Sequence, residues 1–169
     1  MAITLPMGEV IIQSERLTLV LQTPEEVLAR IEAMNPADKA EVSPDWLARA
    51  RASTVADPWI HGFCIVDRAN GVVIGSCGYK GPPDPQGVVE IAYGINPDYQ
   101  GRGYATEAAT ALVDFAFRND GVRLIRAHTL PGNRASAKVL IKCRFEQIGE
   151  VVDAEDGLVC RWERVRPTP

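Results

Sequence analysis

The residues with the clearest chemical meaning form a glycine-rich loop, Gln100-Gly101-Arg102-Gly103-Tyr104-Ala105, which leads into an apolar segment. Small residues in such a loop let consecutive backbone N–H groups approach an anion closely. The helix expected after Tyr104 would add partial positive charge at its N-terminus. The spacing therefore predicts a site for a phosphate or another anion.

Two common nucleotide-binding motifs do not fit this loop. A P-loop requires a Lys-Ser or Lys-Thr pair directly after its glycines, and none follows Gly103. A dinucleotide fingerprint requires a small residue where Thr106 stands, and it belongs in an early βαβ unit of a parallel sheet. Here the loop follows segments that read as antiparallel hairpins. An NAD-dependent oxidoreductase is therefore the weaker alternative.

The elements that must position this loop are recognisable from periodicity and capping signals. Alternating or continuous apolar runs predict strands at residues 16–21, 60–67, 72–79, 88–95, 122–129, 145–152 and 158–165. Start signals predict four helices, beginning after Thr23, after Ser43, at Tyr104 and at Asn133. A helix connects strand 88–95 to strand 122–129, so that pair is expected to be parallel. We predict an α+β fold with a mixed, mostly antiparallel sheet, one parallel step and about four flanking helices.

Length and composition limit the possible classes of protein. The 169 residues, 46% of them hydrophobic, predict a single domain over residues 1–169, with a frayed tail at 166–169. A net charge of -4 argues against a nucleic-acid partner. Neither a secretory leader nor an apolar run long enough to span a membrane is recognisable. We therefore expect a cytoplasmic protein.

The cysteines and histidines do not indicate a metal site. The four cysteines lack CxxC spacing, and we expect them to be reduced thiols. Cys64 and Cys77 flank a predicted Asn70-Gly71 turn, but whether they face each other stays open. His61 and His128 have no acidic or cysteine partner at ligand spacing and are interpreted as ordinary strand residues.

With these elements in order, the sequence resembles the GNAT superfamily of N-acetyltransferases over nearly the whole chain. The family's loop pattern is Gln/Arg-x-x-Gly-x-Gly/Ala, and Gln100, Gly103 and Ala105 occupy its defined places. The turn Pro131-Gly132-Asn133-Arg134-Ala135-Ser136 looks like the Asn-x-x-Ser turn of the ribosomal-protein N-terminal acetyltransferase branch. One departure is Arg144-Phe145, where that branch usually has Gly-Phe.

The resemblance implies that the loop binds the diphosphate of acetyl-CoA, and that the two parallel strands splay apart to admit its pantetheine. A backbone N–H between Tyr93 and Ile95 would hold the thioester carbonyl, and Asn133 would bind pantetheine or cap its helix. The cofactor-binding residues implied in this way are Tyr93, Gly94, Ile95, Gln100, Gly101, Arg102, Gly103, Tyr104, Ala105, Thr106, Asn133 and Ser136. No metal is implied.

Two side chains are candidates for catalysis in this scheme. Glu90 lies between Val89 and Ile91 on the strand beside the acetyl group and could remove a proton from the amine. It could equally face solvent or pair with an arginine such as Arg126. Many superfamily members protonate the thiolate with a tyrosine on the helix that here follows Asn133. This helix has no tyrosine, so Ser136 is the hydroxyl expected there.

The acceptor is the least determined part of the prediction. The family implies transfer of an acetyl group to a primary amine, which could be a protein N-terminus or a small molecule. A catalytically silent acyl-CoA-binding module is the main alternative. A monomer and a homodimer are both compatible with the sequence.

Overall fold

The computed structural model describes residues 11–169. The expectation that no secretory leader is present falls mostly on residues 1–10, which lie outside this described part. Among the helices of residues 11–169, none is both long and apolar enough to cross a membrane.

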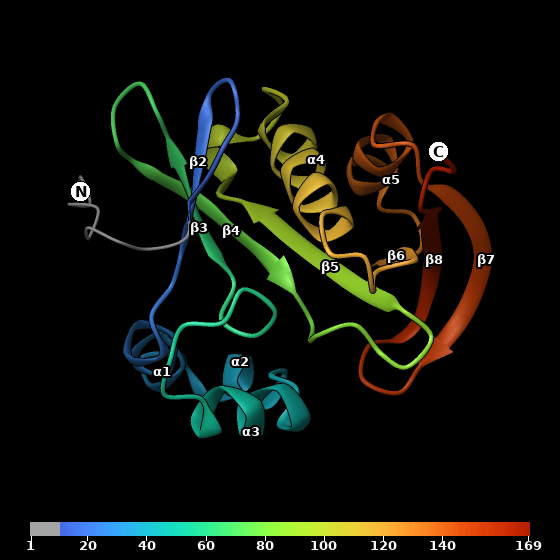
Figure 1. The fold of residues 1–169 in the computed structure, drawn as a ribbon. Coiled ribbons are helices and arrows are strands. Elements are labelled where there is room, and N and C mark those ends of the chain that lie inside the picture. The colour runs from blue at the N-terminus through green and yellow to red at the C-terminus, as the bar shows by residue number, and fades with distance from the viewer. Residues whose placement is uncertain (1–10) are drawn as a thin grey trace.

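The strands form a single sheet in the order β1-β2-β3-β4-β5-β6-β8-β7 (Figure 1). They are β1 (Ile11–Gln13), β2 (Leu17–Leu21), β3 (Phe63–Asp67), β4 (Val73–Tyr79), β5 (Val88–Ile95), β6 (Leu124–Thr129), β7 (Glu146–Asp153) and β8 (Gly157–Val165). Strands β5 and β6 run parallel, and every other adjacent pair in the described sheet is antiparallel. The predicted α+β class with one parallel step is confirmed.

Within residues 11–169, five α-helices and one short 3-10 helix connect the strands. They are α1 (Pro24–Glu32), α2 (Pro36–Ala40), α3 (Pro44–Ala52), η1 (Pro97–Tyr99), α4 (Tyr104–Phe117) and α5 (Arg134–Lys142). Thr23, Asn35 and Ser43 each cap a helix that begins with proline, because their side-chain oxygens accept a backbone N–H three residues on. Figure 1 shows α4 and α5 together on one side of the strands and α1–α3 gathered on the other.

The main core lies between the sheet and α4. The helix buries Ala108, Ala109 and Leu112 completely, and its small residues allow a close approach to the strands. Tyr79 on β4 adds a polar contact, since its hydroxyl donates to the carbonyl oxygen of Leu112. This packing fixes the N-terminus of α4 relative to the neighbouring end of β5.

Strands β5 and β6 separate part-way along their length. Their register runs from Val88 paired with Leu124 to Ile91 paired with Ala127, and it extends no further. Residues 92–95 of β5 pair with β4 alone. The gap opens toward the loop that precedes α4, so the splayed parallel pair implied by the family resemblance is present.

Strand β3 begins later than predicted, at Phe63 instead of residue 60. Residues 57–61 form a turn in which His61 donates its N–H to the carbonyl of Asp57 and accepts the N–H of Asp57 at Nδ1. An apolar run does not by itself distinguish a strand from a buried turn. The interpretation of His61 as a strand residue was therefore wrong, whereas His128 does lie in β6.

Three further features were not determined by the sequence pattern. The short elements β1 and α2 were not predicted. Cys64 and Cys77 lie on opposite faces, because Cys77 is in register with Phe63, the neighbour of Cys64. All four cysteines are free thiols, as expected.

Candidate active site

A cavity of about 670 Å³ lies where the end of β5, the glycine-rich loop and α5 meet. This volume is within the range of small-molecule sites. The cavity is lined by Tyr93, Gly94, Ile95, Tyr99, Gln100, Gly101, Gly103, Tyr104, Ala105, Thr106, Asn133, Ala135, Ser136, Lys138, Val139 and Lys142. The structure thus brings together every residue predicted to bind the cofactor except Arg102, whose guanidinium lies over the ring of Tyr99 instead.

The loop from Gly101 to Thr106 leaves its backbone N–H groups free. None of these six groups donates a hydrogen bond to an acceptor in residues 11–169. Gly101 and Gly103 have φ angles of +78° and +83°, which glycine adopts without strain. Free N–H groups at a helix N-terminus attract anions, and the dipole of α4 adds to this effect. The loop therefore fits a diphosphate.

Arg16 anchors this loop. Its Nη1 donates to the carbonyl oxygen of Arg102 at 2.9 Å, and its guanidinium lies 4.4 Å from the centre of the Tyr104 ring. Its Nε also pairs with Oε2 of Glu107 at 2.8 Å. Burial raises the pKa of Glu107, but hydrogen bonds from Arg16 and Ser14 lower this pKa overall. Arg16 thus neutralises an acid in the same helical turn as the free N–H groups.

Helix α5 contributes polar and charged groups to the cavity. Asn133 caps the helix, because its Oδ1 accepts the N–H of Ser136 at 3.1 Å. Lys138 and Lys142 lie one turn apart, and neither forms an ion pair within residues 11–169. The lining contains no carboxylate, so the cavity is electropositive and suited to phosphate groups.

The gap between β5 and β6 exposes backbone groups of alternate β5 residues. The N–H of Asn96, directly after β5, donates to the carbonyl of Ile74 beside it. Hydrogen bonds alternate along an antiparallel ladder, so Gly94 also bonds toward β4. Tyr93 and Ile95 consequently turn their N–H groups toward the gap. These two groups are available to hold a carbonyl oxygen, and that of Gly94 is not.

The side chains of Tyr93 and Ser136 lie close together in the cavity. The Tyr93 hydroxyl is buried and has no hydrogen-bond partner in the described part of the chain. Burial raises the pKa of Tyr93 to about 12, and the nearby Ser136 hydroxyl partly opposes this rise. The cavity therefore holds two hydroxyl groups, although the sequence analysis assigned Tyr93 a backbone role only.

A second cavity, of about 410 Å³, lies on the side of the sheet that carries α1 and α3. It is lined by Gln22, Arg30, Trp46, Ile60, His61, Gly62, Phe63, Ser76, Cys77, Gly78, Tyr79, Ala92, Tyr93 and Gly94. Tyr93 and Gly94 line both cavities, so the two meet at this point of β5. Two ligands could therefore contact each other there.

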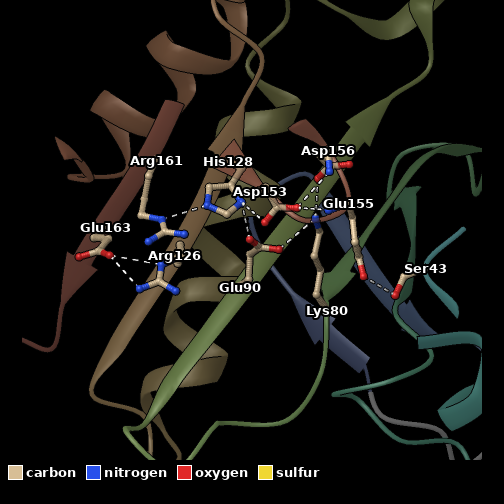
Figure 2. A network of polar contacts seen from close by, with 10 residues as sticks. All are labelled: Ser43, Lys80, Glu90, Arg126, His128, Asp153, Glu155, Asp156, Arg161 and Glu163. Carbon is tan, nitrogen blue, oxygen red and sulfur yellow. Dashed lines mark hydrogen bonds and ion pairs between the residues drawn. The ribbon is translucent and has the colours of Figure 1, made fainter. Parts of the chain in front are cut away.

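Glu90 lies on the same face of β5 as Ala92 and Gly94, but it lines neither cavity. Its Oε2 is 3.0 Å from Nζ of Lys80, and its Oε1 is 2.6 Å from Nδ1 of His128 (Figure 2). The alternative partner considered from sequence, Arg126, binds Glu163 instead, at 3.0 Å.

His128 contacts Glu90 through a defined tautomer. Its Nε2 accepts a hydrogen bond from Nε of Arg161 at 3.1 Å, so the proton of the neutral ring is on Nδ1. Nδ1 faces Glu90, but the geometry of this contact is not that of a hydrogen bond. Burial lowers the pKa of His128, and the charges of Arg161 and Lys80 add to this shift, while Glu90 and Asp153 oppose it. His128 therefore belongs to the surroundings of Glu90, a contact across the sheet that spacing along the sequence did not indicate.

The hairpin between β7 and β8 borders this network. Asp156 contacts Nζ of Lys80 at 3.2 Å, and Glu155 accepts a hydrogen bond from Ser43, the N-cap of α3, at 2.8 Å (Figure 2). The hairpin thereby links α3 to the group of charges around Glu90. Within residues 11–169, no group of three or more His, Cys, Asp or Glu side chains is arranged to hold a metal ion.

Comparison with known sequences decides the family. A model of the acetyltransferase (GNAT) domain matches residues 14–146. The chain belongs to the GNAT family. It is 35% identical over 89 residues to the uncharacterized N-acetyltransferase YjdG of Bacillus subtilis (strain 168), covering 53% of this chain and 51% of that relative. The chain spans about half the length of the curated relatives it matches.

Solved structures have the same GNAT fold. RimL, a ribosomal L7/L12 alpha-N-protein acetyltransferase in complex with coenzyme A, has a TM-score of 0.67 at 19% identity, covering 92% of this chain and 98% of that chain. Aminoglycoside acetyltransferase AAC(6')-Ib in complex with coenzyme A has a TM-score of 0.62 at 21% identity, covering 89% and 95%. The predicted resemblance to this superfamily is confirmed, and ribosomal-protein acetyltransferases are among the structural neighbours.

Several residues of this GNAT site were missed by sequence reasoning. They are Arg16, Tyr99, His128, Ala135, Lys138, Val139 and Lys142. The lysines carried a usable signal, because their spacing of four places both on one face of the helix that Asn133 begins. His128 carried none, since its contact with Glu90 depends on strand pairing across the sheet.

Proposed function

We propose that this protein transfers an acetyl group from acetyl-CoA to a primary amine, by direct attack in a ternary complex. The observation that carries the proposal is the meeting of two cavities at Tyr93 and Gly94. One cavity has the free N–H groups and lysines that suit a diphosphate. The other would hold the amine.

The cofactor side of the proposal rests on backbone groups. The N–H groups of residues 101–106 would bind the diphosphate, and Asn133 would contact pantetheine while it caps α5. The thioester carbonyl would then lie in the gap between β5 and β6. There the N–H of Tyr93 or Ile95 would stabilise the negative charge that develops on the carbonyl oxygen.

Glu90 is the proposed base. It lies four residues before Gly94, which is about 13 Å along an extended strand, so the amine proton would reach its carboxylate through ordered water. Lys80 and His128 hold both carboxylate oxygens in place. Glu90 would first accept a proton from the ammonium, which frees the nitrogen lone pair. The amine nitrogen would then attack the carbonyl carbon, the C–S bond would break, and the further proton lost by nitrogen would be relayed to the thiolate.

The departing thiolate would be met by the hydroxyl groups of Ser136 and Tyr93. A thiol with a pKa near 8.5 requires only a hydrogen bond or a relayed proton at this stage. Both side chains line the cofactor cavity. Ser136 is therefore proposed as the thiolate's partner, as in the sequence analysis, and Tyr93 joins it.

The test is release of free thiol from acetyl-CoA in the presence of amines and peptide N-termini. We expect amine-dependent release and saturable binding of coenzyme A by calorimetry. If the protein binds coenzyme A but no amine or peptide causes thiol release, it is a silent acyl-CoA-binding module. The oxidoreductase alternative is disfavoured by the mostly antiparallel sheet, because dinucleotide sites belong to mostly parallel sheets and β5 and β6 are the one parallel pair in the described sheet.

A further inference from the structure

We infer that the acceptor amine carries a carboxylate, which binds at the side of the second cavity away from the acetyl group. This inference rests on the proposed acetyl transfer and adds the substrate class. It starts from the charge of the cavity, since Arg30 is the one charged residue among those that line it.

The guanidinium of Arg30 is positioned by a buried amide. Its Nη1 donates to Oε1 of Gln22 at 2.9 Å, and Nε2 of Gln22 in turn donates to Sγ of Cys64 at 3.0 Å. Gln22 is only 6% exposed. No carboxylate pairs with Arg30 within residues 11–169, so its remaining N–H groups are available to a ligand.

His61 lines the same cavity and carries a second donor without a partner among the described residues. Its Nδ1 accepts the N–H of Asp57 at 2.9 Å, so the proton of the neutral ring is on Nε2. The side chain is 1% exposed, and Nε2 has no partner among the described residues. A buried N–H group without an acceptor is costly and rare, and a ligand oxygen would satisfy it.

The two donors suit a single negative charge. One guanidinium and one neutral N–H match a carboxylate better than a phosphate dianion. A polyamine or another polycation would bring positive charge against Arg30 with no lining carboxylate to offset it. The acids Glu90 and Asp156 do not line the cavity, and both already contact Lys80.

The strand order sets the length of the acceptor. Gln22 follows β2, whereas Gly94 is on β5, and strands β3 and β4 lie between them. Three strand spacings amount to about 14 Å at the backbone. Gly62, Gly78 and Ala92 line the cavity with little side-chain bulk along this path. The carboxylate and the amine are therefore separated by several bonds.

The experiment compares acceptors of equal length and different charge. ω-Amino carboxylic acids of three to seven carbons are tested beside the corresponding amino alcohols and diamines, with kcat/KM measured by thiol release. We expect the best amino acid to exceed its amino alcohol at least tenfold, with the diamine lowest. Arg30→Gln should reduce this ratio about tenfold. Arg51→Gln, an equal change of charge on α3 outside the cavity, should not.

A second measurement tests carboxylate binding without depending on turnover. Calorimetry with coenzyme A present should show that N-acetyl-ω-amino carboxylates bind to wild type and more weakly to Arg30→Gln. Peptides that begin Ser-Glu and Ser-Gln distinguish a carboxylate on a peptide from one on a free amino acid. A preference for the Ser-Glu peptide over every free amino acid supports a peptide as the acceptor.

The failure of this inference is distinguishable from that of the proposed function. Equal turnover of the three amine classes overturns the carboxylate assignment and leaves acetyl transfer standing. The same holds if the ratio of kcat/KM for the amino acid to that for the amino alcohol is equal in Arg30→Gln and wild type. If coenzyme A binds but no amine causes thiol release from acetyl-CoA, the proposed function is overturned. Absence of N-acetyl product binding in the calorimeter then overturns the carboxylate assignment too.

Discussion

Nδ1 of His128 lies 2.6 Å from Oε1 of Glu90, while Nε2 of the same ring accepts a hydrogen bond from Arg161. The two contacts connect β5 to β8 through β6 and fix the tautomer of the histidine (Figure 2). Lys80 contacts the other oxygen of Glu90. The carboxylate is thereby oriented by His128 on β6 and by Lys80, the residue after β4, which suits its proposed role as a proton acceptor.

Replacing Glu90 with glutamine tests its role as the base. Glu90→Gln should preserve coenzyme A affinity and lower kcat by roughly 10²–10⁴-fold, the range typical of acid–base groups. The loss should shrink as pH rises, because the free amine then deprotonates without help. Steady-state kinetics from pH 6 to 10 measure both effects.

Glu163→Gln is the matched control for this variant. Glu163 has the same 18% side-chain exposure as Glu90 and also pairs with a basic side chain, in its case Arg126. It should retain nearly full turnover. Equal loss in both variants would mean that Glu90 acts through the stability of the sheet.

The lowered pKa of His128 predicts a pH dependence of stability. The unfolded histidine, with a pKa near 6.5, binds a proton more readily than the folded one, in which burial lowers the pKa. Folding stability should therefore fall as pH decreases below about 6.5. Urea unfolding between pH 5 and 8 should show a shallower decrease for His128→Gln than for wild type. Parallel curves would contradict the assignment.

The proposed binding of a diphosphate by the glycine-rich loop can be tested through Gly103. The Cβ atom of a valine there would lie 3.3 Å from Nη2 of Arg16. The branched side chain would lie beside the free N–H groups. Gly103→Val should abolish coenzyme A binding in the calorimeter while the protein stays folded, since a left-handed non-glycine residue costs roughly 1–2 kcal/mol.

Gly71→Val separates backbone strain from loss of the site. Gly71 also has a left-handed φ, +71°, and open space around its Cβ, but it lies in the turn between β3 and β4. It should lose similar stability and keep coenzyme A affinity. A folded Gly103→Val protein with wild-type affinity would refute the assignment of the loop.

The hydroxyls of Ser136 and Tyr93, which we propose contact the thiolate, predict a graded effect on turnover. Ser136→Ala should lower kcat about tenfold or more, the size of one lost charge-assisted hydrogen bond, with cofactor affinity little changed. Tyr93→Phe should have a smaller effect alone and a larger one when combined with Ser136→Ala, because either hydroxyl can donate. Unchanged kcat in the double variant would show that solvent protonates the thiolate.

The sequence was most informative where local chemistry determines structure. The capping box at Thr23 and the proline after Ser43 located α1 and α3 correctly, because each cap depends on residues within one turn. The glycine-rich loop and the helix predicted to begin at Tyr104 are likewise found where the sequence indicated them. These features need no knowledge of distant contacts.

The sequence was least informative where distant strands meet. His128 and Glu90 are brought together by the parallel register of β5 and β6, which no local pattern specifies. Arg16 reaches the loop across 86 positions of the chain. His61 was misread because an apolar run continues through the turn that contains it. Side-chain partners across a sheet depend on register, and a one-residue slip would change them all.

The central claim is that an acetyl group passes directly from coenzyme A to an amine at Tyr93 and Gly94. Its most direct test uses acetyl-CoA labelled in the acetyl group, with initial rates measured while both substrates are varied and the product identified by mass spectrometry. We expect a labelled N-acetyl product and intersecting double-reciprocal lines. Gly94→Leu, which fills the open space above that glycine, should abolish the product. Parallel lines with a labelled protein intermediate, or an unlabelled amine after full thiol release, would contradict it.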